Sequence, residues 1–184
     1  MRTKLKATVL ICLLALLMAL PALGACAPQE KPLSNLVIKV EWVEPISLVP
    51  KPYEMPKSLA SEFNTFHVIL SVTNPNDVLV TVESIQTEVF ANTISMGYVG
   101  TDGPIYLPAG KEAQVRFPIT LMTLNMLKEV VMQKHLSVPD AAKMLLGTWK
   151  AIQDLEASYQ VRGGANVITE TTRWYQNFDL RWQP

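Results

Sequence analysis

The sequence predicts a mainly β protein, built from antiparallel strands with an α-helical insertion before the last two strands. Three observations predict this fold. Apolar side chains alternate with polar ones over several segments, a period of two that is typical of strands with two unlike faces. Between residues 121 and 154 the apolar spacing changes to three and four, which indicates helices. Prolines, glycines and asparagines separate the alternating segments, as turns require.

The first alternating segment begins at Leu36 and continues through Trp42, and Pro45 is expected to end it. Residues 45–56 contain four prolines, so they suit an edge, a loop or a polyproline segment rather than a central strand. We favour a rigid connection that keeps a sheet edge from pairing. A loop that docks a partner is the alternative.

The stretch from Phe66 to Gly97 organises the chain. Its first strand is expected to stop at Asn74-Pro75-Asn76, because an asparagine side chain bonds the nearby backbone and proline fixes its own φ. A second strand then starts near Val78, so we expect a hairpin with a tight corner. A further hairpin turn is predicted at Asn92-Thr93.

The second half of the chain is expected to hold an edge strand, two helices and two final strands. Pro118 lies inside the alternating run 113–120, which favours an edge or a bulge. The first helix begins near residue 121, with an apolar stripe formed by Leu121, Leu124, Leu127 and Val131.

Ser137 is the predicted N-cap of the second helix, and that helix is allowed to break at Gly147. Gly163-Gly164 is predicted to turn the chain between the two final strands. The rings of the last strand, residues 173–182, are expected to supply much of the core.

A family resemblance rests on two short motifs and their spacing. Asn74-Pro75-Asn76 follows an alternating strand, and Leu107-Pro108-Ala109-Gly110 precedes another. In this respect the chain after about residue 35 resembles the LEA14 or water-stress-and-hypersensitive-response (WHy) family. The resemblance implies an immunoglobulin- or fibronectin-III-like β-sandwich in residues 36–184. It implies no catalytic residues, so these motif residues are expected to be structural.

The amino terminus resembles a bacterial lipoprotein signal. Arg2, Lys4 and Lys6 precede an apolar run from Ala7 to Leu20, which is short for a bilayer span but suits a signal-peptide core. Leu23-Gly24-Ala25-Cys26 then resembles a lipobox. We expect cleavage between Ala25 and Cys26, which removes residues 1–25, and attachment of acyl chains such as palmitate to Cys26. An ordinary signal peptide or a plain membrane anchor is the alternative.

Cysteine content and charge agree with an exported, lipid-held domain. Of the two cysteines, Cys12 would leave with the signal peptide, so Cys26 would have no internal partner. Residues 26–35 form a predicted tether, and Ala27 to Asn35 reaches at most about 30 Å. The chain carries 16 basic and 16 acidic residues, of which three basic ones lie before residue 7, so the mature charge is 13 − 16 = −3. This charge argues against a nucleic-acid partner.

Few residues suggest chemistry. No phosphate-binding or nucleophile motif is present in the sequence, and His67 and His135 are not spaced as a metal pair. Ser58, Ser61 and Ser71 have no histidine placed to activate them. Asp154 with Glu156, or Glu83 with Glu88, are interpreted as solvated charges. We therefore expect no enzyme activity, no metal and no cofactor.

The aromatic residues leave two interpretations open. We favour their packing under the proline-rich loop and the helical insertion, whereas a partner surface or sugar-stacking groove is the alternative. The residues concerned are Tyr53, Tyr98, Tyr106, Trp149 and Tyr175.

The sequence thus predicts an extracytoplasmic lipoprotein of the cell membrane or envelope. Its domain is expected to be a non-catalytic binding or stress-protective module that meets the membrane through its anchor and an envelope protein as a possible partner. A glycan-binding or hydrolytic envelope lipoprotein is the alternative.

Overall fold

The computed structural model describes residues 32–47 and 63–184, and residues 34–184 form one compact unit. The elements of this part follow in chain order: β1 (Val37–Ser47), β2 (Phe63–Thr73), β3 (Val80–Ala91), β4 (Ile94–Gly100), β5 (Ile105–Leu107), β6 (Glu112–Met122), α2 (Thr123–Lys134), α3 (Val138–Gln153), β7 (Tyr159–Ile168) and β8 (Arg173–Trp182). No helix in these two ranges combines the length and apolar character needed to cross a bilayer.

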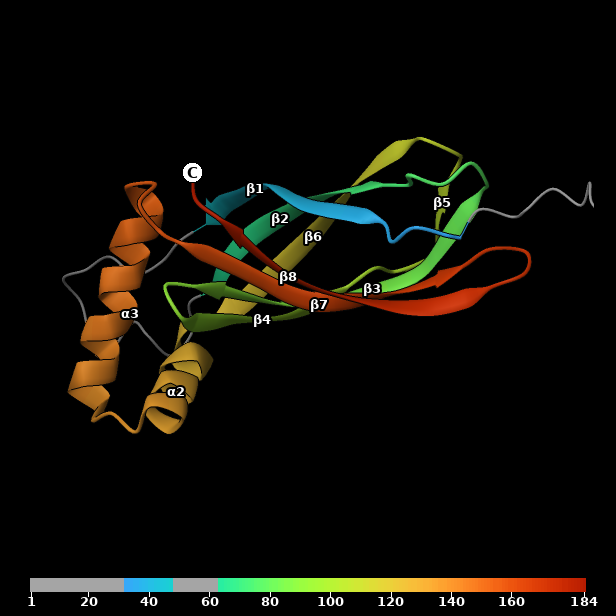
Figure 1. Cartoon of the computed structure of the whole chain (residues 1–184). Coiled ribbons are helices and arrows are strands. Elements are labelled where there is room, and N and C mark those ends of the chain that lie inside the picture. Colours follow the sequence, from blue (N-terminus) through green and yellow to red (C-terminus); the bar gives the residue numbers. More distant parts are fainter. Residues whose placement is uncertain (1–31, 48–62) are drawn as a thin grey trace, which may run out of the picture. The chain divides into compact units, whose positions relative to one another are not determined.

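Two antiparallel sheets surround the hydrophobic core (Figure 1). One sheet has the strand order β1-β2-β6, and the other has the order β4-β3-β7-β8 with β5 paired to β3. Buried side chains of both sheets belong to one core, including Leu70 from β2 and Val161 from β7. The prediction of a mainly β, antiparallel fold with helices before the last two strands is therefore confirmed. The arrangement is compatible with a β-sandwich.

The strands β2 and β3 do not form the predicted hairpin. They pair in different sheets, because β2 lies between β1 and β6 whereas β3 lies between β4 and β7. The Asn74-Pro75-Asn76 corner thus carries the chain from one sheet to the other. The predicted turn at Asn92-Thr93 is confirmed, since Ala91 pairs with Ile94 and both turn residues have positive φ, 46° and 72°.

The edge strands accommodate the prolines. The prediction that Pro45 ends the first strand is wrong, because β1 continues to Ser47 with Pro45 opposite Phe66. Since β1 is an edge strand, a missing amide hydrogen need not break the sheet. The prediction of an edge for Pro118 is confirmed, because β6 is the other edge of this sheet. A register shift in β1 leaves Trp42 45% exposed.

The helices cover one end of the core. Ser137 caps α3 as predicted by accepting a bond from the amide of Asp140, and α3 continues through Gly147 without a break. Trp149 of α3 lies against Phe66 of β2, with ring centroids 5.8 Å apart. The predicted stripe of the first helix is confirmed only for Leu127, because Leu121 still belongs to β6, where it pairs with β2. The other two members, Leu124 and Val131, are half-buried. The buried face of α2 consists instead of Thr123, Met126, Leu127 and Val130.

Gly163 and Gly164 lie inside β7 and not at a turn. A Cβ atom on Gly163 would overlap the Gln86 carbonyl oxygen of β3, and one on Gly164 would overlap the Tyr175 hydroxyl of β8. The glycines therefore permit close approach of neighbouring groups, a role that a sequence pattern does not distinguish from a turn. The chain turns later, where the amide of Thr169 donates to the Thr172 carbonyl at 2.8 Å.

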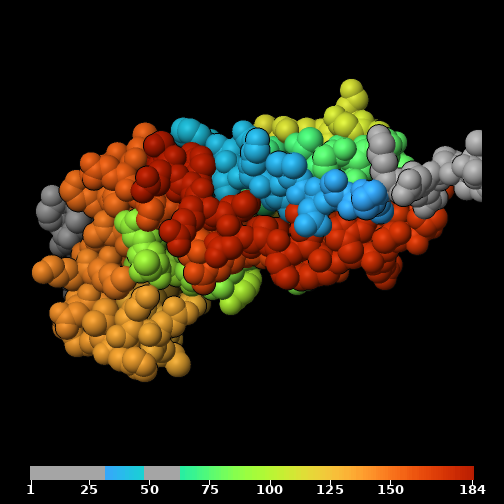
Figure 2. Space-filling view, viewed as in Figure 1, coloured from blue at the N-terminus to red at the C-terminus, as the bar shows by residue number. Residues whose placement is uncertain are grey.

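The last strand, β8, is only half buried, so the prediction that its rings supply much of the core is wrong. It is an edge strand beside β1 of the other sheet (Figure 2). The Gln176 side chain of β8 bonds the residue just before β1, accepting from the Leu36 amide at 2.8 Å and donating to the Leu36 carbonyl at 2.7 Å. Trp42 of β1 and Trp182 of β8 meet edge to face at 5.4 Å.

Candidate functional site

The asparagine corner is the most densely hydrogen-bonded part of the predicted motif. Asn74 is fully buried, and its side-chain nitrogen donates to the carbonyls of Val78 at 2.8 Å and Leu107 at 2.9 Å. A third, longer contact reaches the Pro108 carbonyl at 3.2 Å. The Asn74 side-chain oxygen accepts from the amide of Asn76 at 3.0 Å. One buried side chain therefore satisfies backbone groups of two separate loops.

Asn76 extends this network to the start of the domain. Its side-chain oxygen accepts from the Ser34 amide at 2.7 Å, and its side-chain nitrogen donates to the Ser34 carbonyl at 3.0 Å. Its own carbonyl accepts from the Gly110 amide at 3.2 Å, where Gly110 has a positive φ of 65°. The last two residues of the predicted tether, Ser34 and Asn35, thus belong to the compact unit of the domain.

We call Asn74, Asn76 and residues 107–110 the corner clasp. The structure brings together the two motifs that lie 33 residues apart, from Asn74 to Leu107. Leu107 is buried, whereas Pro75, Pro108, Ala109 and Gly110 are exposed. These contacts give the motif residues a structural part in holding the chain reversals together. The bonds to Val78 and to the Asn76 amide agree with the prediction that the Asn74 side chain bonds the nearby backbone. The bonds to Leu107 and Ser34 were not foreseen, because hydrogen-bond partners far apart in sequence leave no local pattern.

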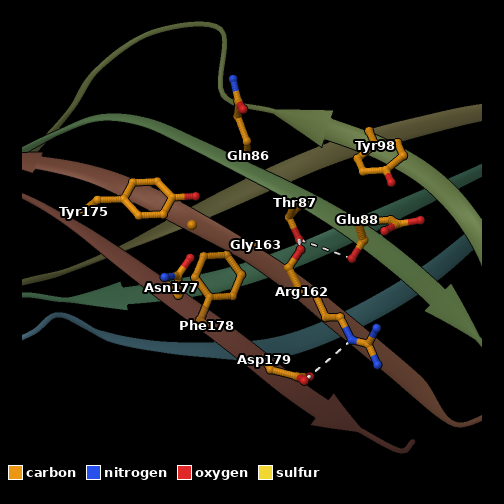
Figure 3. Close-up of a pocket in the computed structure, with 11 residues that line it drawn as sticks. Gln86, Thr87, Glu88, Tyr98, Arg162, Gly163, Tyr175, Asn177, Phe178 and Asp179 are labelled. Atoms are coloured by element: carbon orange, nitrogen blue, oxygen red, sulfur yellow. Dashed lines mark hydrogen bonds and ion pairs between the residues drawn. The ribbon is translucent and has the colours of Figure 1, made fainter.

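A hollow lies on the outer face of the five-stranded sheet, with a volume of about 450 Å³ (Figure 3). Tyr98 of β4 and Tyr175 of β8 stand on opposite sides of it and are 79% and 57% exposed. Gly163 and Gly164 of β7 lie between them, so the floor is backbone rather than side chain. Such a shallow, open surface can accept an extended or flat ligand.

Polar groups around the hollow are largely paired with one another. Arg162 lies 3.6 Å from the Asp179 carboxylate and donates to the Gln160 side chain at 2.9 Å. Glu88 accepts a bond from Ser95 at 2.7 Å. A hydrogen bond to Glu88 raises the pKa of Tyr98 above its ordinary value of 10.0, with the negative charge of Glu88 acting in the same direction. Tyr98 therefore stays a neutral phenol near pH 7.

These lining groups can bind but do not form a recognisable catalytic set. Two carboxylates, one guanidinium and the amides of Gln86 and Asn177 offer hydrogen bonds to a polar ligand. Tyrosine offers an apolar ring and a polar tip to the same ligand. In the two described ranges, no three His, Cys, Asp or Glu side chains are grouped as they would be to hold a metal ion.

Comparison with protein families decides the classification of the chain. A model of the LEA_2 family, described as late embryogenesis abundant protein, matches residues 70–180. The chain belongs to this family. In this LEA_2 chain the matched range includes the corner clasp from Asn74 to Gly110 and all the residues that line the hollow. A comparison with curated proteins gave no match.

Several solved structures are similar to the LEA_2 chain at low identity. A solution structure from Arabidopsis thaliana has 12% identity and a TM-score of 0.46, covering 87% of this chain and 89% of its own. A second solution structure, provisionally described as a late embryogenesis abundant (LEA) protein, has 15% identity and a TM-score of 0.40, covering 97% and 83%. A crystal structure from Archaeoglobus fulgidus has 11% identity and a TM-score of 0.39, covering 83% and 98%.

The structure separates the aromatic residues of this LEA_2 chain into two groups. Trp149 belongs to α3 and is buried against Phe66 of β2. The favoured interpretation is wrong for Tyr98, Tyr106 and Tyr175, which remain more than half exposed. In β8, Tyr175 shares the exposed register of Arg173 and Asn177, and this pattern could have indicated its exposure. The segments around Tyr98 and Tyr106 carry no such pattern. Tyr53 lies outside the described residues.

The remaining predicted site residues are dispersed. His67 Nδ1 lies 3.5 Å from the Glu44 carboxylate, and His135 is the C-cap of α2 with a φ of 53°. Glu83 pairs with Arg173 at 2.9 Å, and Asp154 pairs with Lys150. Ser71 is buried in β2. Ala25, Cys26, Ser58 and Ser61 lie outside the described residues, so their predictions rest on the sequence.

Proposed function

We propose that this chain is a membrane-anchored envelope lipoprotein whose LEA_2 domain serves as a non-catalytic binding or stress-protective module. The observation that carries the proposed role of the domain is the family match over residues 70–180. The resemblance to the LEA14 or WHy family suggests protection against stress or desiccation. The outer-face hollow supplies a surface on which such a module can bind another molecule.

The anchor is proposed from the sequence before the domain. Leu23-Gly24-Ala25-Cys26 supports cleavage before Cys26 and acylation of its thiol, which places the domain outside the cytoplasm. Two or three acyl chains hold a protein firmly at a bilayer. On this proposal residues 26–33 form the tether, and the domain begins at Ser34.

Fractionation of cells tests the anchor. Cys26→Ser is expected to move the protein from the membrane fraction to the soluble fraction, because no thiol remains for the thioether. Cys12→Ser is the matched control, because Cys12 lies within the proposed signal peptide. The Cys12→Ser variant should stay in the membrane fraction. Retention of the Cys26→Ser protein without acylation would contradict the anchor.

Survival under stress tests the role of the module. A deletion strain is expected to lose viability after drying and osmotic shock, and the wild-type chain is expected to restore it. If the deletion strain survives both treatments like its parent, the protective role is lost while a binding role remains open to the ligand tests below. The Cys26→Ser chain shows whether protection needs attachment to the membrane.

We also propose that the two sheets form a sandwich of the immunoglobulin or fibronectin-III type. The division into sheets of three and five strands, with β2 and β3 in different sheets, supports this. Experimental coordinates with the same crossing between sheets would support the classification. A closed barrel would contradict it.

Glycan binding is the second candidate function, and the exposed tyrosines favour it. Tyr98 and Tyr175 stand beside a hollow that also presents amides and carboxylates, which suits the apolar faces and hydroxyl groups of sugar rings. Calorimetry with peptidoglycan fragments and neutral oligosaccharides tests it. Tyr98→Ala and Tyr175→Ala should each weaken binding. Tyr106→Ala should not, although the exposure of Tyr106, 67%, lies between theirs. Release of free sugar from the same fragments would instead favour a hydrolase.

A further inference from the structure

Exposed apolar side chains gather at the corner clasp. Val78 and Leu79 follow the asparagine corner and are 42% and 55% exposed, and Tyr106 of β5 is 67% exposed. Tyr106 pairs with Thr81 of β3, and Leu79 directly precedes that strand, two residues before Thr81. The Val78 carbonyl and the Leu107 carbonyl both accept from the Asn74 side-chain nitrogen, within 2.9 Å. We call Val78, Leu79 and Tyr106 the corner face.

The chain enters the domain beside the corner face. Ser34 makes two hydrogen bonds to Asn76, which stands two residues before Val78. The proposed acylated residue, Cys26, precedes Ser34 by eight residues, and these span at most about 28 Å when fully extended. This end of the domain is therefore held within a short distance of any bilayer that carries the lipid. The helices α2 and α3 lie at the other end of the sheets (Figure 1).

Charge around the corner face favours an apolar contact. Asp77 and Lys111 adjoin the clasp and are of opposite sign, and Glu112 at the start of β6 adds a negative charge. Such a surface offers no basic cluster for anionic headgroups. Tyrosine is enriched at membrane interfaces, where its ring lies among headgroups and its hydroxyl stays wet. A tether also raises the effective concentration of a weak contact, so a small apolar surface suffices.

We propose that the corner face rests on the lipid bilayer, with Val78, Leu79 and Tyr106 in the interfacial region and the helices directed away from it. This inference rests on the proposed lipid anchor at Cys26. It assigns a second function to the clasp, which fixes both the tether and the surface that the tether brings to the membrane. The hollow beside Tyr98 and Tyr175 then remains open to other molecules of the envelope.

The test supplies the anchor chemically. The mature chain, beginning at Cys26, is coupled through its single thiol to a maleimide lipid in phosphatidylcholine nanodiscs. A spin-labelled lipid in the disc then broadens the NMR signals of nearby residues. Signals from residues 77–80 and 105–110 are expected to lose intensity, whereas those of α2 and α3 are not. Adding phosphatidylglycerol should not strengthen the effect, because the contact does not depend on basic residues.

Variants separate contact from mere proximity. Leu79→Gln with Tyr106→Ser should reduce the broadening at the corner severalfold, while Met132→Gln is the matched control because Met132 is 74% exposed on α2. Uniform broadening, or broadening strongest at the helices, would overturn the proposal. So would an unchanged pattern in the double variant, which would leave the corner face for a protein partner. Because the lipid is coupled in vitro, the nanodisc experiment tests the corner face separately from the anchor. Absence of acylation in cells would contradict the lipid anchor alone.

Discussion

Replacement of Asn74 by alanine tests the corner clasp directly. The side chain is fully buried, donates to the carbonyls of Val78 and Leu107, and accepts from the amide of Asn76. Alanine removes all of these bonds and offers no polar atom in return. The carbonyls and the amide then remain in place without their partner, since the corner backbone is held by neighbouring bonds such as that from the Asn74 amide to the Lys111 carbonyl at 2.9 Å.

The magnitude follows from the number of groups left unpaired. An intramolecular hydrogen bond contributes about 0.5–1.5 kcal/mol net, and a buried polar group without a partner costs about 1–3 kcal/mol. Water can reach part of this corner and bond some of the carbonyl and amide groups that lose their partner. The free-energy cost for those groups is therefore below the full value for a buried unpaired group. We therefore expect Asn74→Ala to lower the free energy of unfolding by about 3–5 kcal/mol.

Urea unfolding followed by tryptophan fluorescence measures the change. With a urea slope of about 2 kcal/mol per molar for a domain of this size, the midpoint should fall by about 1.5–2.5 M without a change of slope. Asn166→Ala is the matched control, because Asn166 makes one exposed bond to Ser84 at 3.0 Å. That variant should lose less than about 0.5 kcal/mol. A loss below about 1 kcal/mol for Asn74→Ala would refute the reasoning.

Two further predictions concern β7. Gly163→Ala should destabilise the domain far more than Gly164→Ala. The Cβ added at Gly163 meets the Gln86 backbone, whereas the Cβ added at Gly164 meets the movable end of the Tyr175 side chain. Equal urea midpoints for the two variants would contradict the close approach of β3 to Gly163. Burial raises the pKa of Tyr159 from 10.0 to about 12. The neutral, buried phenol of Tyr159 therefore contributes fully to the free energy of unfolding below about pH 10, and this contribution is lost as the pH rises towards 12. Tyr159→Phe should show a shallower decline of the midpoint above pH 10, and an identical decline would argue against this burial.

Local patterns predicted most strands, helices and caps of this LEA_2 domain. The period of two indicated β2, β3 and β7, and Ser137 before Pro139 indicated the start of α3. The pattern did not tell which strands pair, because side-chain alternation is the same in a hairpin and in a crossing between sheets. The β2–β3 corner was misjudged for this reason.

Tertiary contacts decided the other differences. Glycine is required at position 163 of β7 because the Gln86 carbonyl oxygen occupies the space that a Cβ atom would take. The sequence does not show this, since the oxygen belongs to a neighbouring strand. Pro45 lies within β1 because that strand is an edge. The motif around Asn74 was recognised from the sequence, whereas the hollow between Tyr98 and Tyr175 arises from four strands brought together by folding.

Intact-mass spectrometry of the protein purified from its native membrane tests the central claim most directly. The account predicts a chain that begins at Cys26 and carries the added mass of a diacylglyceryl group, with or without a further acyl chain. A chain that begins at Met1, or a cleaved chain with an unmodified Cys26, would contradict it.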